Sequence, residues 1–186
     1  MIAAAGCSSD TKGSGVKSVQ SGTPDPTSTP DQTATPDPVG SYKNPAKINE
    51  TITLESTGST HNVVVDPVKR GTEANYLVAS ANEFNDKPAP GYEYILVPVA
   101  VQYVKGDQSS ENIGPIDFKA FANGVECKSS FVVLPNNIIE LSSGDVMQGG
   151  TKAGFILYQV PQNQEVLISY QPNMFESSTA YISVGK

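Results

Sequence analysis

A histidine is the commonest base of hydrolytic sites, and this 186-residue chain has a single one, His61. A base there would need a serine nucleophile and an acid placed by the fold, and no G-x-S-x-G or similar nucleophile motif accompanies it. A zinc site would need further ligands, and there is no second histidine. Because a lone histidine in a strand-like run is usually structural, we predict no catalytic residue. The alternative is an extracellular hydrolase with an unrecognised site near His61.

Three carboxylates, Asp107, Glu111 and Asp117, surround one polar loop, and such oxygen ligands can hold calcium in extracellular proteins. Their spacing matches no EF-hand loop, so we predict no metal site and keep the three only as weak calcium candidates. The sequence contains no phosphate-binding loop and no dinucleotide-binding glycine series. We therefore predict no cofactor.

The two cysteines, Cys7 and Cys127, have different predicted roles. Residues 2–7, IAAAGC, place small side chains directly before Cys7, which is typical of a bacterial lipobox whose cysteine becomes the lipid attachment site. Only MIAAAG precedes that cysteine, whereas a full signal has a basic and an apolar region; an accidental run of small residues is the alternative. Cys127 lies in strand-like sequence and is expected to be a buried or half-buried free thiol.

Residues 23–40 repeat a six-residue unit, TPDPTS, TPDQTA and TPDPVG, with prolines 24, 30 and 36 in register. Proline-rich sequence with so little apolar surface cannot build a core, so we predict a disordered, extended stalk. A polyproline ligand for a signalling domain is the alternative. The predicted organisation is a residual signal peptide and lipobox at 1–7, a stalk at 8–42 and a folded domain at 43–186.

The formal net charge is −7, with no basic run. Diffuse negative charge disfavours nucleic acid and anionic membrane as electrostatic partners. We therefore expect no nucleic acid partner. The expected partners are the membrane, through a lipid on Cys7, and a protein or cell-wall ligand.

The element that must position any site is a central strand at 91–104, GYEYILVPVAVQYV. Alternation places one set of side chains on a predicted core face and the other set on the opposite face. The core set is Ile95, Val97, Val99, Val101 and Tyr103; the opposite set is Leu96, Pro98, Ala100, Gln102 and Val104. Since Pro98 cannot donate to a ladder, the strand should have an edge, a bulge or an unpaired side there.

Short strand-like runs with turn signals surround this strand. We expect a hairpin of residues 51–55 and 61–68, a short helix at 72–82 with Thr72 as its N-cap, and a tight turn at Asn123–Gly124. A strand through YLVA competes with that helix. Further strands are expected in IDFKAF, VECKSSFVVLP, TKAGFILYQVP, EVLISYQP and STAYISV, while KGDQSSENIGP and LSSGDVMQGG should be connections. The pattern predicts an all-β, antiparallel β-sandwich with one short helix.

Several segments together resemble one family, and they cover about residues 44–184: NPAKINETITLE, RGTEANYLVASANEFNDKPAPGYEYILVPVAVQYVKGD, DFKAF, GGTKAGFILYQVP and LISYQP. The family is a bacterial domain of unknown function with an immunoglobulin-like sandwich, common in surface lipoproteins of Gram-positive bacteria and similar in fold to a secreted mycobacterial antigen. The resemblance implies the fold and offers no catalytic motif. This chain departs from the pattern at Pro98.

The sequence thus predicts a non-enzymatic, lipid-anchored extracellular binding or accessory module on the outer face of the cytoplasmic membrane, with an unknown ligand. Tyrosines are the residues best suited to a recognition surface, because each ring offers apolar area and a polar hydroxyl. We expect most of them to pack in the core. The tyrosines considered are Tyr92, Tyr94, Tyr103, Tyr158, Tyr170 and Tyr181.

Overall fold

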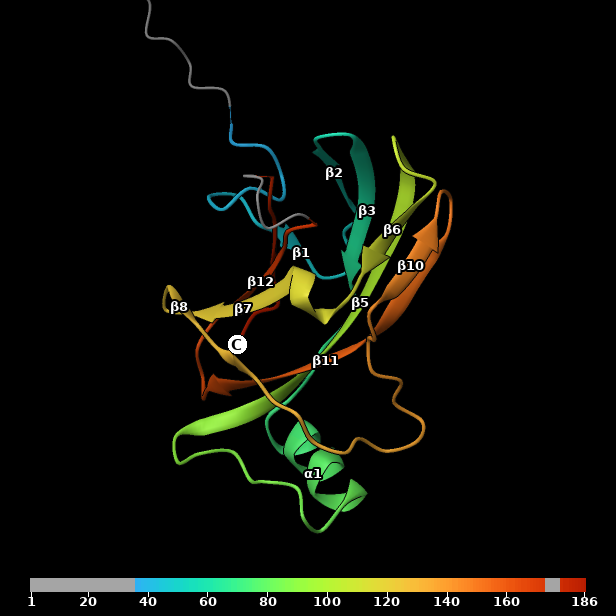
Figure 1. The fold of residues 1–186 in the computed structure, drawn as a ribbon. Coiled ribbons are helices and arrows are strands. Elements are labelled where there is room, and N and C mark those ends of the chain that lie inside the picture. Colours follow the sequence, from blue (N-terminus) through green and yellow to red (C-terminus); the bar gives the residue numbers. More distant parts are fainter. Residues whose placement is uncertain (1–35, 173–177) are drawn as a thin grey trace, which may run out of the picture. The chain divides into compact units, whose positions relative to one another are not determined.

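The computed structural model describes residues 36–172 and 178–186. The predicted lipid attachment at Cys7 and most of the predicted stalk lie outside the described residues. The described chain forms an all-β sandwich of the immunoglobulin-like kind with one short helix, as the sequence predicts (Figure 1). No described helix is long and apolar enough to cross a membrane.

One layer is a six-stranded sheet in the order β2-β3-β5-β11-β9, with β4 paired to β5 off this path. Its longest members, β5 and β11, run antiparallel through eleven paired positions. The strands are β2 (Ile52–Ser56), β3 (Ser59–Val65), β4 (Lys69–Arg70), β5 (Tyr92–Gly106), β9 (Lys128–Ser129) and β11 (Thr151–Pro161).

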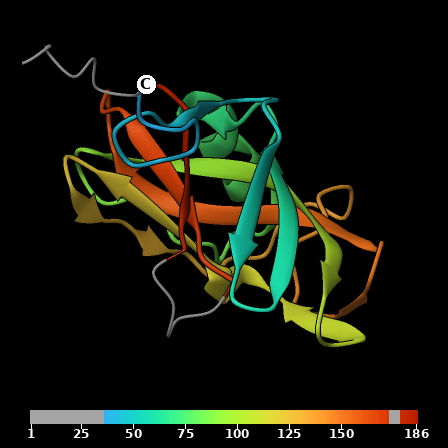
Figure 2. The same cartoon turned by 90° about the horizontal axis from the view of Figure 1, so that it is seen from above.

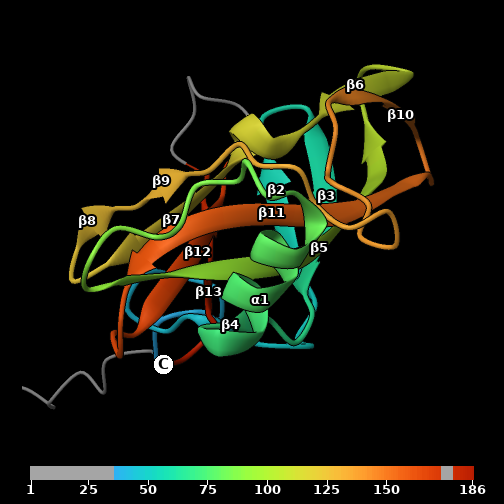
Figure 3. The same ribbon diagram turned by 90° about the horizontal axis from the view of Figure 1, so that it is seen from below.

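The other layer is a five-stranded sheet in the order β1-β13-β12-β7-β8, in which β1 and β13 are parallel. A separate pair, β6 and β10, lies at the end of the molecule opposite β8 (Figure 3). The strands are β1 (Ala46–Lys47), β6 (Ser110–Ile113), β7 (Phe118–Ala122), β8 (Val125–Glu126), β10 (Gly144–Met147), β12 (Val166–Tyr170) and β13 (Ala180–Ser183).

The main core lies between the two sheets, and the predicted faces of β5 are confirmed. Val97 and Val101 are completely buried in this core, and Val99 is 3% exposed. Leu96 points to the other face, where helix α1 (Thr72–Ala81) covers it in a second, smaller core. Figure 1 shows α1 on the side of β5 and β11 away from β7 and β12.

Pro98 lies where the ladder beside β5 is interrupted, as its missing N–H requires. The pairing with β3 ends at Val65 and Val99, and the pairing with β4 begins at Lys69 and Leu96. Between these points the carbonyl of Pro98 accepts a hydrogen bond from the Asp66 N–H at 3.0 Å. An interior strand can therefore contain this proline.

Two predicted turns have the expected backbone. Asn123 and Gly124 both have positive φ, 52° and 75°, which is the type I′ geometry that joins β7 to β8 with the right twist. The predicted hairpin of β2 and β3 is also confirmed, with Ser56 paired to Ser59 across its turn (Figure 2).

The structure corrects four local predictions. The polar segment expected as a turn contains β6, and the glycine-rich segment expected as a connection contains β10; the two pair with each other. The run FVVLP is not a strand, and Phe131 is 96% exposed. The helix begins one residue earlier than a Thr72 cap requires: Gly71, at φ 60°, is the N-cap, and no side chain caps it.

The folded unit also begins before residue 43. Gly40 is buried, and its carbonyl accepts a hydrogen bond from the Tyr181 N–H at 2.8 Å. Tyr42 and Tyr181 form an edge-to-face ring pair with centroids 5.5 Å apart. The last residues assigned to the stalk therefore pack on the C-terminal strand, beside the C-terminus in Figure 2.

Candidate functional site

One concave site is formed by helix α1 and the proline-rich loop after it, on the outer face of the six-stranded sheet. The helix packs Ala74 and Val78 against Tyr94, Leu96 and the smaller core. Helical spacing places Ala74 and Val78 on one side of α1, so the side chains on its other side face solvent. Tyr76, on that side, is 70% exposed.

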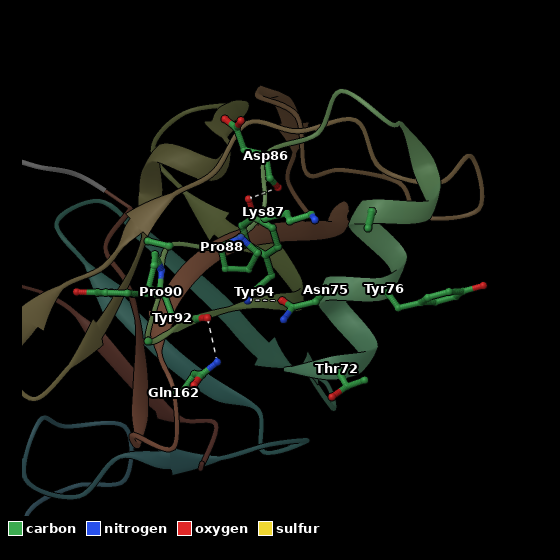
Figure 4. Close-up of a pocket in the computed structure, with 13 residues that line it drawn as sticks. Thr72, Asn75, Tyr76, Asp86, Lys87, Pro88, Pro90, Tyr92, Tyr94 and Gln162 are labelled. Carbon is green, nitrogen blue, oxygen red and sulfur yellow. Dashed lines mark hydrogen bonds between the residues drawn. The ribbon is translucent and has the colours of Figure 1, made fainter.

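Hydrogen bonds fix the helix and the loop to β5. The Tyr94 N–H donates to Asn75 Oδ1 at 2.9 Å, which ties α1 to the start of the strand. The Tyr94 hydroxyl donates to the Asp86 carbonyl at 2.9 Å, which ties the loop to the same residue. Figure 4 shows both bonds. Tyr94 therefore positions both walls at once.

Asn85 holds the end of the helix against a second loop. Its Nδ2 atom donates to the Val78 carbonyl and the Val133 carbonyl, each at 2.7 Å. Its Oδ1 atom accepts from the Val133 N–H at 2.9 Å. These three bonds link the end of α1 to the segment around Val133, so Asn85 serves as a structural clamp.

An ion pair anchors the segment that leads into α1. Arg70 Nε lies 2.6 Å from Glu93 Oε1, and both side chains are mostly buried. The guanidinium also donates to the carbonyls of Gly185 and Gln164, each at 2.8 Å. Arg70 therefore links the entry to the helix with the C-terminal end of the chain.

The resulting pocket has a volume of about 570 Å³ (Figure 4). Asn75 and Thr72 line it from the helix, and Tyr76 and Tyr92 lie on opposite sides of it. Gln162 closes one end by donating to the Tyr92 carbonyl at 3.2 Å. The other lining residues are Ala79, Asp86, Lys87, Pro88, Ala89, Pro90, Gly91 and Tyr94.

The pocket combines apolar rings with a few polar groups, which suits binding. Burial raises the pKa of the Tyr94 hydroxyl, and the charge of Asp86 raises it further. The hydroxyl is therefore a fixed donor to the loop. Lys87 and the rings of Tyr76 and Tyr92 remain at the rim for a ligand.

His61 lies in a different place, inside the main core. Its side chain is 0% exposed, and its ring lies 5.5 Å from that of Tyr103 and 5.9 Å from that of Tyr170. His61 Nε2 is 2.8 Å from Glu111 Oε2, although neither ring nitrogen has a partner with hydrogen-bond geometry among the described residues. Burial lowers the pKa of His61, and the charge of Glu111 partly opposes this shift. A base without solvent access is poorly placed for hydrolysis.

The three weak calcium candidates each have a separate structural contact. Glu111 faces His61, the Asp117 carboxylate accepts from the Gly114 N–H at 2.8 Å, and the Asp107 N–H donates to the Gly58 carbonyl at 2.8 Å. Among residues 36–172 and 178–186, no group of three or more His, Cys, Asp or Glu side chains is placed to hold a metal ion.

Asp117 is nevertheless electrostatically unusual. Burial raises its pKa to about 6; the nearby Glu111 charge adds to the shift, and the Gly114 N–H opposes it. Burial also raises the pKa of Tyr170, and the charges of Asp117 and Glu111 act in the same direction. Both carboxylates therefore act on Tyr170, whose ring packs against His61.

The predicted tyrosine and cysteine placements are largely confirmed. Tyr94, Tyr103, Tyr158 and Tyr170 are buried, whereas Tyr92 is 41% exposed. Cys127 is a half-buried free thiol whose pKa is raised chiefly by burial.

The sequence reasoning missed Asn75, Tyr76 and Gln162. The helical period that identified α1 also places Tyr76 on the side of the helix away from its apolar residues. This position could have predicted that Tyr76 is exposed. Asn75 and Gln162 had no such signal, because their partners lie 19 and 70 residues away along the chain.

The described residues form a small β-sandwich domain. The chain belongs to the DUF4352 family, a domain of unknown function, whose model matches residues 46–180. This is the kind of family that the sequence resemblance implied. No curated protein matches the chain.

Solved structures with the same fold include two proteins of Bacillus subtilis. The chain is similar to ycdA, named as a candidate lipoprotein, with a TM-score of 0.53 and 12% identity over 73% of this chain and 39% of ycdA. It is similar to the yjhA protein with a TM-score of 0.52 and 18% identity over 75% of this chain and 98% of yjhA. MPT63, a secreted protein of Mycobacterium tuberculosis, matches with a TM-score of 0.49 and 13% identity over 76% of this chain and 98% of MPT63. At these identities the likenesses to ycdA and yjhA show the fold alone.

Proposed function

We propose that the chain is a non-enzymatic module displayed on the outer face of the cytoplasmic membrane by a lipid on Cys7. In this proposal it binds a protein or cell-wall ligand through the pocket beside α1. The observation that carries the proposal is that the pocket walls are fixed before any ligand arrives. The Tyr94 N–H donates to the Asn75 side chain, and the Tyr94 hydroxyl donates to the Asp86 carbonyl, so strand, helix and loop are joined.

A preorganised site favours binding because the protein loses less conformational entropy when the ligand binds. Pro88 and Pro90 restrict the loop further. Tyr76 and Tyr92 add exposed rings on either side, and such rings are enriched at recognition surfaces. The arrangement suits a polymer or peptide segment with both apolar and hydrogen-bonding groups.

The competing hydrolase near His61 lacks support from the site. His61 is completely buried between the sheets, and its neighbours are Tyr103, Tyr170 and Glu111. A general base must reach the proton of its substrate or of a water. The burial of His61 therefore favours a structural role over the hydrolase.

The anchor is tested on the native protein. A lipid on Cys7 requires that Cys7 is the first residue and carries a diacylglyceryl group. We expect mass spectrometry of the N-terminal peptide of the native protein to find that mass. An unmodified Cys7 with the upstream residues still attached would contradict the anchor and leave the binding proposal standing.

The binding proposal is tested by co-sedimentation with isolated cell walls, using the full chain with Cys7→Ser to remove the lipid. Tyr76→Ala should lower the fraction bound, because Tyr76 lies at the pocket. Tyr42→Ala is the matched control: Tyr42 is 64% exposed, close to the 70% of Tyr76, and lines a different part of the surface. If the wall fraction is the same for all three proteins, the pocket does not bind the wall.

A further inference from the structure

A second concave site, distinct from the pocket beside α1, lies along the edge of the sandwich. It is a groove of about 440 Å³, and none of its residues lines the pocket beside α1. It runs between β7, the β8–β9 segment and β11, and it receives side chains from residues 129–131 and 140–141. Its apolar walls are Phe118, Phe131, Leu141, Phe155, Ile156 and Leu157.

One wall depends on a glycine in β11. A Cβ atom on Gly154 would lie 2.5 Å from the Leu141 backbone nitrogen, so only glycine lets the segment before β10 approach the strand. Leu141 donates its N–H to the Phe155 carbonyl at 2.9 Å and so lies along the edge of β11. The groove is therefore built from fixed backbone.

Tyr158 supplies a polar group among these apolar walls. Its side chain is 2% exposed, and its buried hydroxyl has no hydrogen-bond partner among the residues that the structure describes. Leaving a buried hydroxyl unpaired costs free energy, and most buried polar groups in proteins do have a partner. Tyr158 also lines the groove, so a ligand whose oxygen reaches this hydroxyl would supply the missing acceptor.

The residues around Tyr158 keep its hydroxyl protonated and disfavour a negatively charged ligand. Burial raises the pKa of Tyr158, and the charges of Glu126 and Cys127 act in the same direction, so the hydroxyl stays protonated. Lys119 at the groove is paired with Glu126 at 3.0 Å, while Glu140 adds a further carboxylate. An anionic ligand would meet net negative charge here.

The exposed apolar side chains at the rim of the groove favour an apolar ligand. Phe131 is 96% exposed and Ile116 is 72% exposed, and both line the groove. The volume lies in the range of small-molecule sites. The whole set of features therefore specifies a small, apolar, uncharged molecule with an oxygen that accepts a hydrogen bond.

We propose that this groove binds a neutral apolar small molecule whose carbonyl or ether oxygen accepts a hydrogen bond from Tyr158. The site goes beyond the function proposed above, because it shares no residue with the pocket beside α1. Its occupant is a small molecule, whereas the pocket is proposed to take a protein or cell-wall segment.

The test uses Nile red, a neutral apolar dye with one carbonyl, and the full chain with Cys7→Ser. We expect saturable binding at one site, read from the rise in dye fluorescence. Tyr158→Phe should weaken it by about fivefold, the effect of one lost hydrogen bond. The variant should fold, because it removes a hydroxyl that has no described partner.

Tyr170→Phe is the matched control. Tyr170 is also buried with an unpartnered hydroxyl among the described residues, and it does not line the groove. It should leave dye affinity unchanged, as should Tyr76→Ala at the other pocket. Equal weakening by Tyr158→Phe and Tyr170→Phe, or binding that does not saturate, would overturn the proposal.

Cys127 gives a readout that needs no tyrosine variant. Its thiol lines the groove and is the remaining cysteine after Cys7→Ser. Saturating Nile red should slow maleimide labelling of Cys127 several-fold, and prior labelling should block the dye. Labelling at the same rate with and without dye would place the dye elsewhere and overturn the groove as its site.

Discussion

Val99 tests the side-chain alternation of β5 at the scale of one residue. It is 3% exposed and faces the core between the sheets. Val99→Asp would bury an unpaired carboxylate at a cost of several kcal/mol, compared with about 5–15 kcal/mol that stabilise a typical domain. We expect the variant to be largely unfolded in circular dichroism melts.

Gln102, on the opposite face of β5, is the control for that variant. It is half-buried and bonds to Asn62 and to the Gly149 carbonyl. Gln102→Asp should cost about 1 kcal/mol, in the usual range of a substitution outside the core. A greater loss for Gln102→Asp than for Val99→Asp would mean that the strand register is shifted by one residue.

Asp117 gives a pH-dependent prediction. Its pKa is raised from 3.8 to about 6 in the folded chain, chiefly by burial and then by Glu111. The folded state therefore binds this proton more tightly than the unfolded state. Its contribution to stability is present below about pH 4 and is lost as the pH rises from about 4 to about 6.

We expect Asp117→Asn to remove that loss while its side-chain oxygen still accepts from the Gly114 N–H. The free energy of unfolding of the variant, relative to the natural chain, should increase between pH 4 and pH 7 in urea titrations. His61 acts oppositely, because its lowered pKa makes stability fall as the pH drops below about 6.5. Since both proteins retain His61, the difference isolates Asp117. The control is Asp145→Asn, which changes an exposed carboxylate on β10. If the difference in the free energy of unfolding between Asp117→Asn and the natural chain is constant with pH, the prediction is wrong.

At the scale of the elements, local signals predicted what depends on near neighbours. Alternation identified β5, and Asn123 and Gly124 identified their hairpin, because these signals act within a few residues. The pairing of β6 with β10 had no such signal: Glu111 and Val146 meet across 35 residues of chain, in polar or glycine-rich sequence. The FVVLP run has apolar residues but forms no ladder: Val133 bonds to Asn85, and Val132 and Leu134 pack against the smaller core. The His61–Glu111 contact and the pocket beside α1 were unpredictable for the same reason, since separate strands and loops form them.

Asn85 tests how firmly α1 and its loop are held. Asn85→Ala removes three hydrogen bonds to Val78 and Val133 and leaves backbone groups without those partners. We expect a loss of about 2 kcal/mol in the free energy of unfolding from urea titrations. Asn112→Ala is the control, because Asn112 is exposed and its side chain donates to the exposed Asp145 carboxylate at 3.1 Å. A loss for Asn85→Ala no greater than that of the control would mean that the clamp contributes little.

At the scale of the whole molecule, the two concave sites occupy different surfaces of the sandwich. The pocket beside α1 lies over the outer face of the six-stranded sheet, and the groove with Tyr158 lies at the edge between the sheets. The core between the sheets contains His61 and the tyrosines that surround it. The sandwich thus has both proposed sites on its outside and its only histidine inside.

The junction between the predicted stalk and the sandwich gives the last prediction. Residues 8–35 are rich in Pro, Thr, Ser and Asp, and sequence with so little apolar surface should add little to the stability of the domain. Gly40 and Tyr42, in contrast, contact Tyr181 on β13. Removal of residues 8–35 should therefore leave the melting temperature within about 2 °C in differential scanning calorimetry. Extending the deletion through residue 44 should lower it by about 4 °C or more, because the bonds and ring contact to β13 are lost as well. If the shorter deletion lowers the melting temperature as much as the longer one, the proline-rich segment itself docks on the sandwich.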